Sequence, residues 1–120
     1  MPDELPEPIR TYLDARAAGD VDTALGCCVD DAVLVDVDVA HRGREQIQAV
    51  LSRPIGERHL TFRIVDATRI SDDRYDVVNR VEGDLGGNLE GVVELRYRFF
   101  LRQGRIEVLV IEFADATAHP

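Results

Sequence analysis

The first half of the chain contains three stretches in which apolar residues recur every three or four positions. This spacing gathers apolar side chains on one face of a helix and therefore predicts three helices. Prolines fit the first turn of the first helix, and Asp20 is placed to cap the second. The apolar face of the third carries Ile47, Val50 and Leu51. The predicted helices span Glu4–Ala18, Val21–Cys28 and the residues from Gly43 up to Pro54.

Alternation of apolar and polar residues predicts five strands, of which the last four follow one another directly. The predicted strands span Ala32–Val39, Leu60–Ile70, Arg74–Leu85, Gly91–Arg102 and Arg105–Phe113. Short polar or glycine-containing turns between the last four predict an antiparallel meander. The order predicts an α+β fold, with three N-terminal helices packed on one face of a curved, mostly antiparallel β-sheet. Helices laid on such a sheet leave a cone-shaped cavity between the two layers.

Length, charge and cysteine content narrow the class of protein. The 120 residues suit one domain over residues 1–120, with 114–120 as a loose tail. A formal net charge of -9 disfavours binding to nucleic acid or to an anionic membrane. The N-terminus lacks a signal-peptide pattern, and no apolar run is long enough to span a membrane. The adjacent Cys27 and Cys28 predict reduced thiols, so we expect a cytoplasmic protein.

Four short stretches along the chain resemble one superfamily. They are YLDARAAGDVDTAL, VDDAVLVD, RGREQI and QGRIEVLVIEF, in this order. With the predicted layout, they resemble the nuclear transport factor 2-like (NTF2-like) superfamily, in particular its ketosteroid isomerase-like and polyketide cyclase (SnoaL-like) branch. The resemblance implies the cone-shaped NTF2-like fold. Since this superfamily includes isomerases, cyclases, hydrolases, dehydratases and proteins without a reaction, the fold alone does not determine the activity.

The resemblance also implies two catalytic residues. In ketosteroid isomerases a tyrosine lies seven residues before the Gly-Asp that joins the first two helices, and Tyr12 has this place before Gly19. Their general base is an aspartate five residues after the second Asp of an Asp-Asp-Ala, which makes Asp36 the expected base. The third isomerase group, a protonated aspartate on the penultimate strand, is replaced here by Arg96 or Leu95.

Each candidate has a functional and a structural interpretation. An apolar cavity would raise the pKa of Asp36 and suit it to proton abstraction, whereas at an open strand end it would face solvent or a backbone amide. Asp38 lies one pleat further on the same predicted face, so it either shares a proton with Asp36 or forms a rim salt bridge with His41 or Arg42. Tyr12 is either a donor to a developing oxyanion or a core tyrosine.

The strands supply the remaining candidates. Asn79 shares a predicted strand face with Val77, so its amide either orients a carbonyl or water or lies on a solvent face. The full predicted pocket lining is Arg16, Cys28, His41, Val50, Leu51, Val77, Leu95, Arg96, Tyr97, Leu109, Ile111 and Phe113.

The penultimate strand allows two orientations. Alternation points Leu95 and Tyr97 inward, whereas the ungapped resemblance points Arg96 inward. A β-bulge at Phe99-Phe100 would reconcile the two. An inward Arg96 flanked by carboxylates would resemble limonene epoxide hydrolase-like proteins.

These observations predict a small isomerase or cyclase that needs no cofactor. Asp36 would take a proton next to the carbonyl of an apolar compound, and Tyr12 would stabilise the enolate. The alternatives are a hydrolase or dehydratase, with Asp36 or Asp38 positioning a water, and a non-catalytic ligand-binding domain. No metal is expected, because the histidines lack ligand spacing. Both faces of the last predicted strand are apolar, so we expect a homodimer through the sheet.

Overall fold

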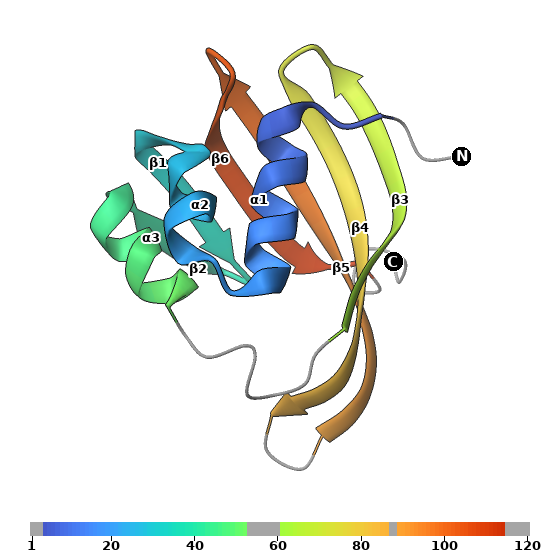
Figure 1. Cartoon of the computed structure of the whole chain (residues 1–120). Coiled ribbons are helices and arrows are strands. Elements are labelled where there is room, and N and C mark those ends of the chain that lie inside the picture. Colours follow the sequence, from blue (N-terminus) through green and yellow to red (C-terminus); the bar gives the residue numbers. More distant parts are fainter. Residues whose placement is uncertain (1–3, 53–60, 87–88, 115–120) are drawn as a thin grey trace.

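The computed structural model describes residues 4–52, 61–86 and 89–114, and its side chains are described outside 84–90. The helices are α1 (Glu7–Ala18), α2 (Val21–Gly26) and α3 (Gly43–Leu51) (Figure 1). The strands are β1 (Cys28–Asp36), β2 (Val39–Arg42), β3 (Thr61–Ser71), β4 (Arg74–Gly86), β5 (Leu89–Arg102) and β6 (Arg105–Phe113). The predicted helix stop at Pro54, part of the turn at 86–88 and nearly all of the predicted tail lie outside the described residues.

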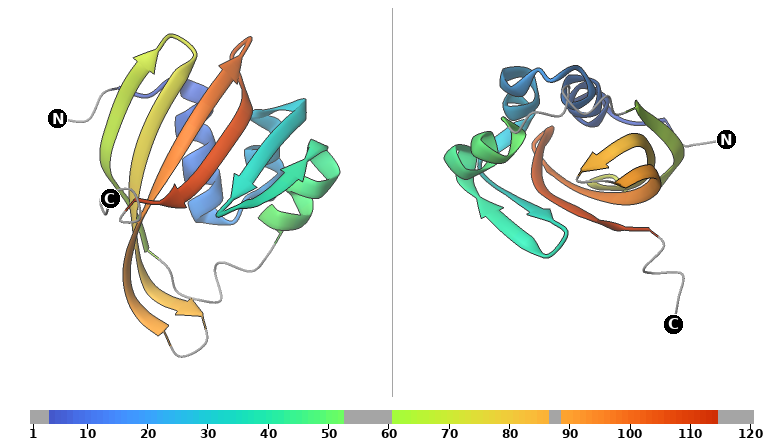
Figure 2. Two further views of the ribbon diagram at one scale, coloured as in Figure 1. Left: turned by 180° about the vertical axis from the view of Figure 1, so that it is seen from behind. Right: turned by 90° about the horizontal axis from the view of Figure 1, so that it is seen from below.

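The strands form a single six-stranded sheet in the order β2-β1-β6-β5-β4-β3. Neighbouring strands are antiparallel except for β1 and β6, which run parallel. Figure 2 shows that the sheet is curved and that the helices lie on one side of it. The predicted α+β class and the curved, mostly antiparallel sheet are therefore confirmed. We call the helix-covered side the inner face and the opposite side the outer face.

The first two helices are delimited by local signals. Helix α1 follows Pro6, whose backbone is extended, and ends at Gly19, whose φ of 75° is left-handed. The N–H of Gly19 bonds back to the last turn of the helix, as expected of a glycine C-cap. The carboxylate of Asp20 accepts a hydrogen bond from the backbone N–H of Thr23 at 3.2 Å and so caps α2 as predicted. Helix α2 ends at Gly26 rather than at Cys28.

The predicted strand Ala32–Val39 is wrong at both ends. Strand β1 begins at Cys28, because this segment pairs with β6, and ends at Asp36. Val37 and Asp38 then form a two-residue turn with φ of 44° and 74°, and β2 returns antiparallel with Val39 opposite Asp36. Such a hairpin needs φ above zero at both turn positions, which usually selects Asn or Gly. Val37 and Asp38 lack this preference and continue the alternation of apolar and polar residues along β1. The sequence pattern therefore did not predict that the chain reverses direction here.

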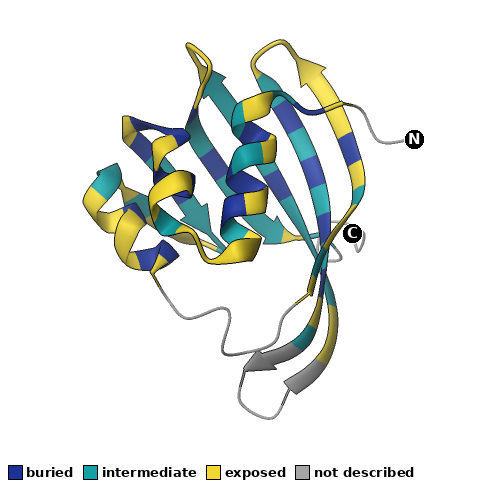
Figure 3. Cartoon of the chain, viewed as in Figure 1, coloured by how far each residue is buried: buried dark blue, intermediate teal, exposed yellow. Residues whose placement is uncertain are grey.

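The core lies between the helices and the inner face of the sheet. Figure 3 shows buried residues recurring along β4, β5 and β6 where the helices cover them. Tyr12 packs edge-on against Phe99 with ring centroids 6.0 Å apart, and Tyr97 stacks on Phe99 at 6.2 Å. This aromatic cluster fixes α1 against the centre of the sheet.

Candidate active site between helix α1 and the inner face

Three cross-strand rows on the inner face organise the candidate site. The strand register places these residues side by side, and opposite residues in a sheet share a face. The Leu34 row consists of Leu34, Leu109, Phe99 and Tyr75. The Asp36 row consists of Asp36, Ile111, Tyr97 and Val77. The Asn79 row consists of Phe113, Leu95, Asn79 and Ile64.

Helix α1 contacts β6 and runs in the same direction as β1 and β6 (Figure 1). Tyr12 packs on Phe99 in the Leu34 row. Arg16 follows four residues later on the same helix face, about 6 Å along the axis, and two residues of a strand advance by about the same distance. Arg16 therefore lies over the next row, which contains Asp36 and Tyr97.

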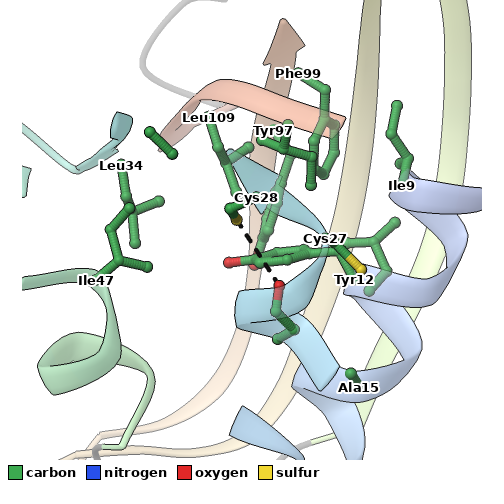
Figure 4. Close-up of a cluster of buried hydrophobic side chains, with 14 of the residues drawn as sticks. Ile9, Tyr12, Ala15, Cys27, Cys28, Leu34, Ile47, Tyr97, Phe99 and Leu109 are labelled. Atoms are coloured by element: carbon green, nitrogen blue, oxygen red, sulfur yellow. Dashed lines mark hydrogen bonds between the residues drawn. The ribbon is translucent and has the colours of Figure 1, made fainter. Parts of the chain in front are cut away.

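The hydroxyl group of Tyr12 is held in its neutral form. Tyr12 is 2% exposed, and its side chain points from α1 toward Cys28 and Tyr97 (Figure 4). Burial raises its pKa well above the usual value, a charge on Tyr97 would raise it further, and the positive charge of Arg16 opposes the shift. Because the proton stays on Tyr12 at all physiological pH values, this group can donate a hydrogen bond but cannot act as a base.

Tyr97 and Asn79 form a polar pair on neighbouring strands. Burial raises the pKa of Tyr97, whereas the charge of Arg16 and a hydrogen bond with the Asn79 side chain lower it. Asn79 is the buried polar residue of the described core, 4% exposed, so it lies on the inner face and not on a solvent face. The pairing itself was not predicted, although the sequence places both residues on inward positions of consecutive strands.

Asp36 presents a carboxylate to the same region. Its side chain is partly buried, and within residues 4–52, 61–86 and 89–114 it forms neither a hydrogen bond nor an ion pair. Its negative charge raises the pKa values of both Tyr12 and Tyr97, which places it near the two phenols. The fold thus brings a carboxylate without a partner toward two neutral hydroxyl groups.

Two predicted site residues lie elsewhere. Asp38 is exposed in the turn, so it does not continue the face of Asp36 and is not a second carboxylate of the pocket. Arg96 lies on the outer face, where it pairs with Glu112 at 3.5 Å, and it does not line the pocket. The arginine-and-carboxylate arrangement that Arg96 would have formed in the cavity is therefore absent. Alternation correctly predicted that Leu95 and Tyr97 face inward.

The β-bulge that was considered at Phe99-Phe100 lies one step later. The register of β5 against β6 shifts between Phe100 and Leu101, so it leaves the orientation of residues 95–99 unchanged. His41 was expected in a loop but lies in β2 opposite Leu34, at the edge of the inner face and partly buried.

Apolar residues surround the polar groups. Leu109, Val77, Val50 and Leu51 are buried, and Ile111 and Leu95 are partly buried against them. In the Asn79 row, Phe113 and Ile64 remain 44% and 40% exposed, so an apolar surface continues beyond the covered core. Phe62 and Ile64 on β3 were not predicted as lining, although their alternation already placed them on one strand face.

Cys28 is buried beside this region. Its thiol donates a weak hydrogen bond to the carbonyl oxygen of Ala24 at 3.8 Å (Figure 4), and burial raises its pKa to about 11. It borders a cavity of about 10 Å³, together with Tyr12, Leu34, Ile47 and Leu109. This volume is comparable with that of one water molecule and too small for a substrate.

Two negative observations concern only the described residues. Among them, no three His, Cys, Asp or Glu side chains gather as metal ligands would. No helix in the same ranges has the length and apolar character needed to cross a membrane. The expectation that no metal or cofactor is needed stays a prediction.

Known proteins share this architecture. The SnoaL-like domain family model matches residues 9–109, whereas no curated protein matches the chain. Protein SMa1630 from Sinorhizobium meliloti, a candidate polyketide cyclase, is 27% identical, with 90% of this chain and 95% of that chain covered and a TM-score of 0.78.

Two more distant structures share the fold. A hypothetical protein from Catenulispora acidiphila with a ketosteroid isomerase-like fold, solved with trimethylamine, is 18% identical, covers 90% of this chain and 85% of its own, and gives a TM-score of 0.75. An LEH-like epoxide hydrolase from M. tuberculosis is 20% identical to this chain. The match covers 91% of this chain and 81% of the hydrolase, with a TM-score of 0.74. With its NTF2-like α+β fold and a family match over most of its length, the chain belongs to the SnoaL-like domain family.

Proposed function

We propose that the protein is a small enzyme of isomerase or cyclase type that acts on an apolar carbonyl compound without a cofactor. One observation carries the proposal: the carboxylate of Asp36, which has no hydrogen-bond or ion-pair partner among the described residues, lies near the buried, neutral hydroxyl of Tyr12. The similarity to the candidate polyketide cyclase of S. meliloti supports a carbonyl substrate. The substrate would occupy the predicted cone-shaped cavity over the Asp36 and Asn79 rows.

In the proposed reaction Asp36 removes a proton from the carbon next to the substrate carbonyl. The electron pair of the C–H bond forms a carbon–carbon double bond, and the carbonyl π pair moves onto oxygen. Tyr12 donates a hydrogen bond to this oxyanion and keeps its own proton. In the isomerisation of a ketone with a neighbouring carbon–carbon double bond, Asp36 then returns the proton to the far carbon of the conjugated enolate as the carbonyl re-forms. In a cyclisation, the enolate carbon attacks a second carbonyl, the π pair of that carbonyl moves onto its oxygen, and this oxygen takes the proton from Asp36. Dry apolar walls strengthen both electrostatic effects.

The experiment that tests this function is deuterium uptake into a carbonyl compound in heavy water. Wild-type protein should exchange the protons next to the carbonyl, and Asp36→Asn should not. If neither protein exchanges them while both bind the compound equally, the domain binds ligands without chemistry, which was the third prediction from the sequence.

A hydrolase or dehydratase remains the second candidate, and the Tyr97–Asn79 pair favours it. A carboxylate, an amide and a phenol around one point can hold and activate a water molecule. Here Asp36, Asn79 and Tyr97 would do so, and neither Asp38 nor Arg96 takes part. Oxygen-18 from labelled solvent should then enter the product, whereas an isomerisation leaves the product oxygen atoms unlabelled.

We further propose that the protein is a homodimer that pairs through the outer face. Valines of β1 and β6 lie side by side there, with Val35 opposite Val110 and Val33 opposite Val108, and all four are only partly buried. Next to them, Arg98 pairs with Glu112 at 2.9 Å. A second copy would cover this apolar stripe and shield the ion pair.

A location in the cytoplasm is proposed from the two thiols, Cys27 and Cys28, which are buried and free. The net charge of -9 supports a small-molecule partner rather than nucleic acid or a membrane surface.

A further inference from the structure

Arg16 is a cation on the helix face that covers the candidate site. Its guanidinium Nη1 donates a hydrogen bond to the carbonyl oxygen of Leu51 at 3.2 Å. Leu51 is the last residue of α3, and a helix C-terminus favours a nearby positive charge. This bond ties α1 to α3 and keeps the partly buried guanidinium over the Asp36 row.

The positive charge of Arg16 acts on both phenols of the site. It lowers the pKa values of Tyr12 and Tyr97 against the larger effect of burial, so the guanidinium lies near both hydroxyl groups. The bond to Leu51 engages one of its five N–H donors, and the rest of the planar group remains available.

Among the partly buried arginines that the structure describes, Arg16 has a distinct environment. Every other partly buried arginine in the described ranges has a carboxylate within 4.0 Å; these are Arg44, Arg74, Arg80, Arg96 and Arg98. Within the same ranges Arg16 has none. Asp36, the carboxylate in the row beneath it, forms no ion pair with it. A cation withdrawn from water without a counter-ion is unfavourable, so a ligand anion at this place would be stabilised.

We infer that Arg16 binds the carboxylate of the substrate, so that the ligand of this site is a small keto acid with an apolar body. This inference rests on the proposed function and names its substrate class. A single planar guanidinium matches the two oxygen atoms of a carboxylate. A phosphate dianion would meet Asp36 and a net charge of -9, and among the described residues Arg16 is the cation that lies over this row to offset them. The partly exposed apolar residues of the Asn79 row would receive the body of the ligand.

The arrangement also assigns an orientation. Tyr12 and Arg16 present their polar groups along one helix face, while Asp36 faces them from the sheet. A carboxylate on Arg16 and a carbonyl oxygen on Tyr12 would turn the carbon next to the carbonyl toward Asp36. Arg16 would offset the repulsion between the substrate carboxylate and Asp36, because its charge lies near both.

Calorimetric titration tests the inference with 4-oxo-4-phenylbutanoate and its uncharged primary amide as probes. Wild-type protein should bind the acid more tightly than the amide. Arg16→Met replaces the aliphatic stem of the side chain, removes the guanidinium and should weaken binding of the acid by roughly 10- to 100-fold, with little change for the amide. Arg10→Met is the matched control, because Arg10 lies exposed on the same helix and its loss changes the net charge equally. Circular dichroism should show that both variants fold.

Three results would overturn the inference: equal binding of acid and amide to the wild type, no binding of the acid, or unchanged acid affinity in Arg16→Met. Deuterium uptake next to the ketone of the same acid separates this failure from failure of the proposed function. If deuterium uptake depends on Asp36 but Arg16→Met does not change the affinity for the acid, the proposed enzyme function is supported and the keto-acid substrate class is refuted. If the preference for the acid depends on Arg16 but no deuterium is taken up, the carboxylate-binding site is supported and the proposed reaction is refuted.

Discussion

Asp36 and Tyr97 lie in one row of the sheet, two strands apart, with Ile111 between them. Neighbouring strands are about 4.8 Å apart, so the two backbones are about 10 Å apart and both side chains rise from the same face. A proton acceptor and a hydrogen-bond donor thus border a single apolar patch beneath α1.

Asp36→Asn should lower the rate of proton abstraction by roughly 100- to 10,000-fold, the usual contribution of a general base. Its side chain makes no hydrogen bond to other described residues, so the midpoint of urea unfolding should change little. Asp38→Asn is the matched control, because Asn tolerates the left-handed backbone at this exposed turn position. Equal activity losses in both variants would contradict the assignment of Asp36.

Tyr12→Phe should lower the rate by roughly 100- to 1,000-fold, as the loss of one oxyanion donor does. The ring stays in place against Phe99, so the free energy of unfolding should remain within about 1 kcal/mol of the wild type. Steady-state kinetics should place the loss in kcat rather than in KM, since the bond strengthens only in the transition state. A change confined to KM would indicate a binding tyrosine instead.

The stability of the protein should fall between pH 9 and pH 11 through Cys28. Burial, reinforced by Cys27, raises the pKa of Cys28 from 9.0 to about 11, so the unfolded chain loses this proton first. The contribution of Cys28 to the free energy of unfolding should then drop by up to about 1.4 kcal/mol for each pH unit in that window, in addition to the losses from Cys27, Tyr12 and Tyr97, whose pKa values burial also raises. All 14 basic residues counted as Lys or Arg are arginine, so no lysine titration obscures the effect.

Urea unfolding of the wild type and Cys28→Ala from pH 8 to pH 11 measures this dependence. The variant should be less stable at pH 8 because it leaves a small cavity, yet its stability should decline less steeply above pH 9. An identical slope in both proteins would exclude Cys28 as the titrating group.

Val110→Asp should convert the proposed dimer into a monomer. Val110 lies opposite Val35 on the outer face, and a carboxylate there, even beside Arg98 of β5, would lose its water in the dimer and keep it in the monomer. Sedimentation velocity at micromolar concentration measures the change. Gln48→Glu is the control, because Gln48 is exposed on α3, on the helix-covered side of the sheet, and the change adds the same negative charge. A monomeric wild type would refute the dimer directly.

Much of the fold could be predicted because its elements carry their own signals. The strand β6 begins and ends at the predicted residues, and the period of two correctly directed Tyr97 toward the core. The turn at Val37 and Asp38 could not be predicted, because a Val-Asp pair has no preference for positive φ and the alternation runs through it. The early start of β1 depends on pairing with β6, a contact between distant segments that local pattern does not contain.

The candidate site was predictable only in part. Tyr12 and Asp36 were located by their intervals from Gly19 and Asp31, and both lie in the region around the Asp36 row. The alternation also predicted that Asp38 lies on the same strand face as Asp36. This would hold only if the strand continued to Asp38, whereas it ends at Asp36. The sequence did not predict that Arg16 lacks an ion pair with the described residues. Which of the other arginines pair with a carboxylate is determined by the register of β4, β5 and β6 and not by the sequence around Arg16.

The parallel pairing of β1 with β6 has a consequence for how the protein is made. The backbone N–H of Val37, directly after Asp36, donates a hydrogen bond to the carbonyl oxygen of Ile111 at 2.9 Å. The residue that holds the backbone after the candidate base is thus synthesised later than the three helices and the strands β3 to β5. A nascent chain that has completed its helices and the β3–β5 meander still cannot position Asp36. Asp36 would therefore reach its place in the candidate site only after β6 has been synthesised and has paired with β1.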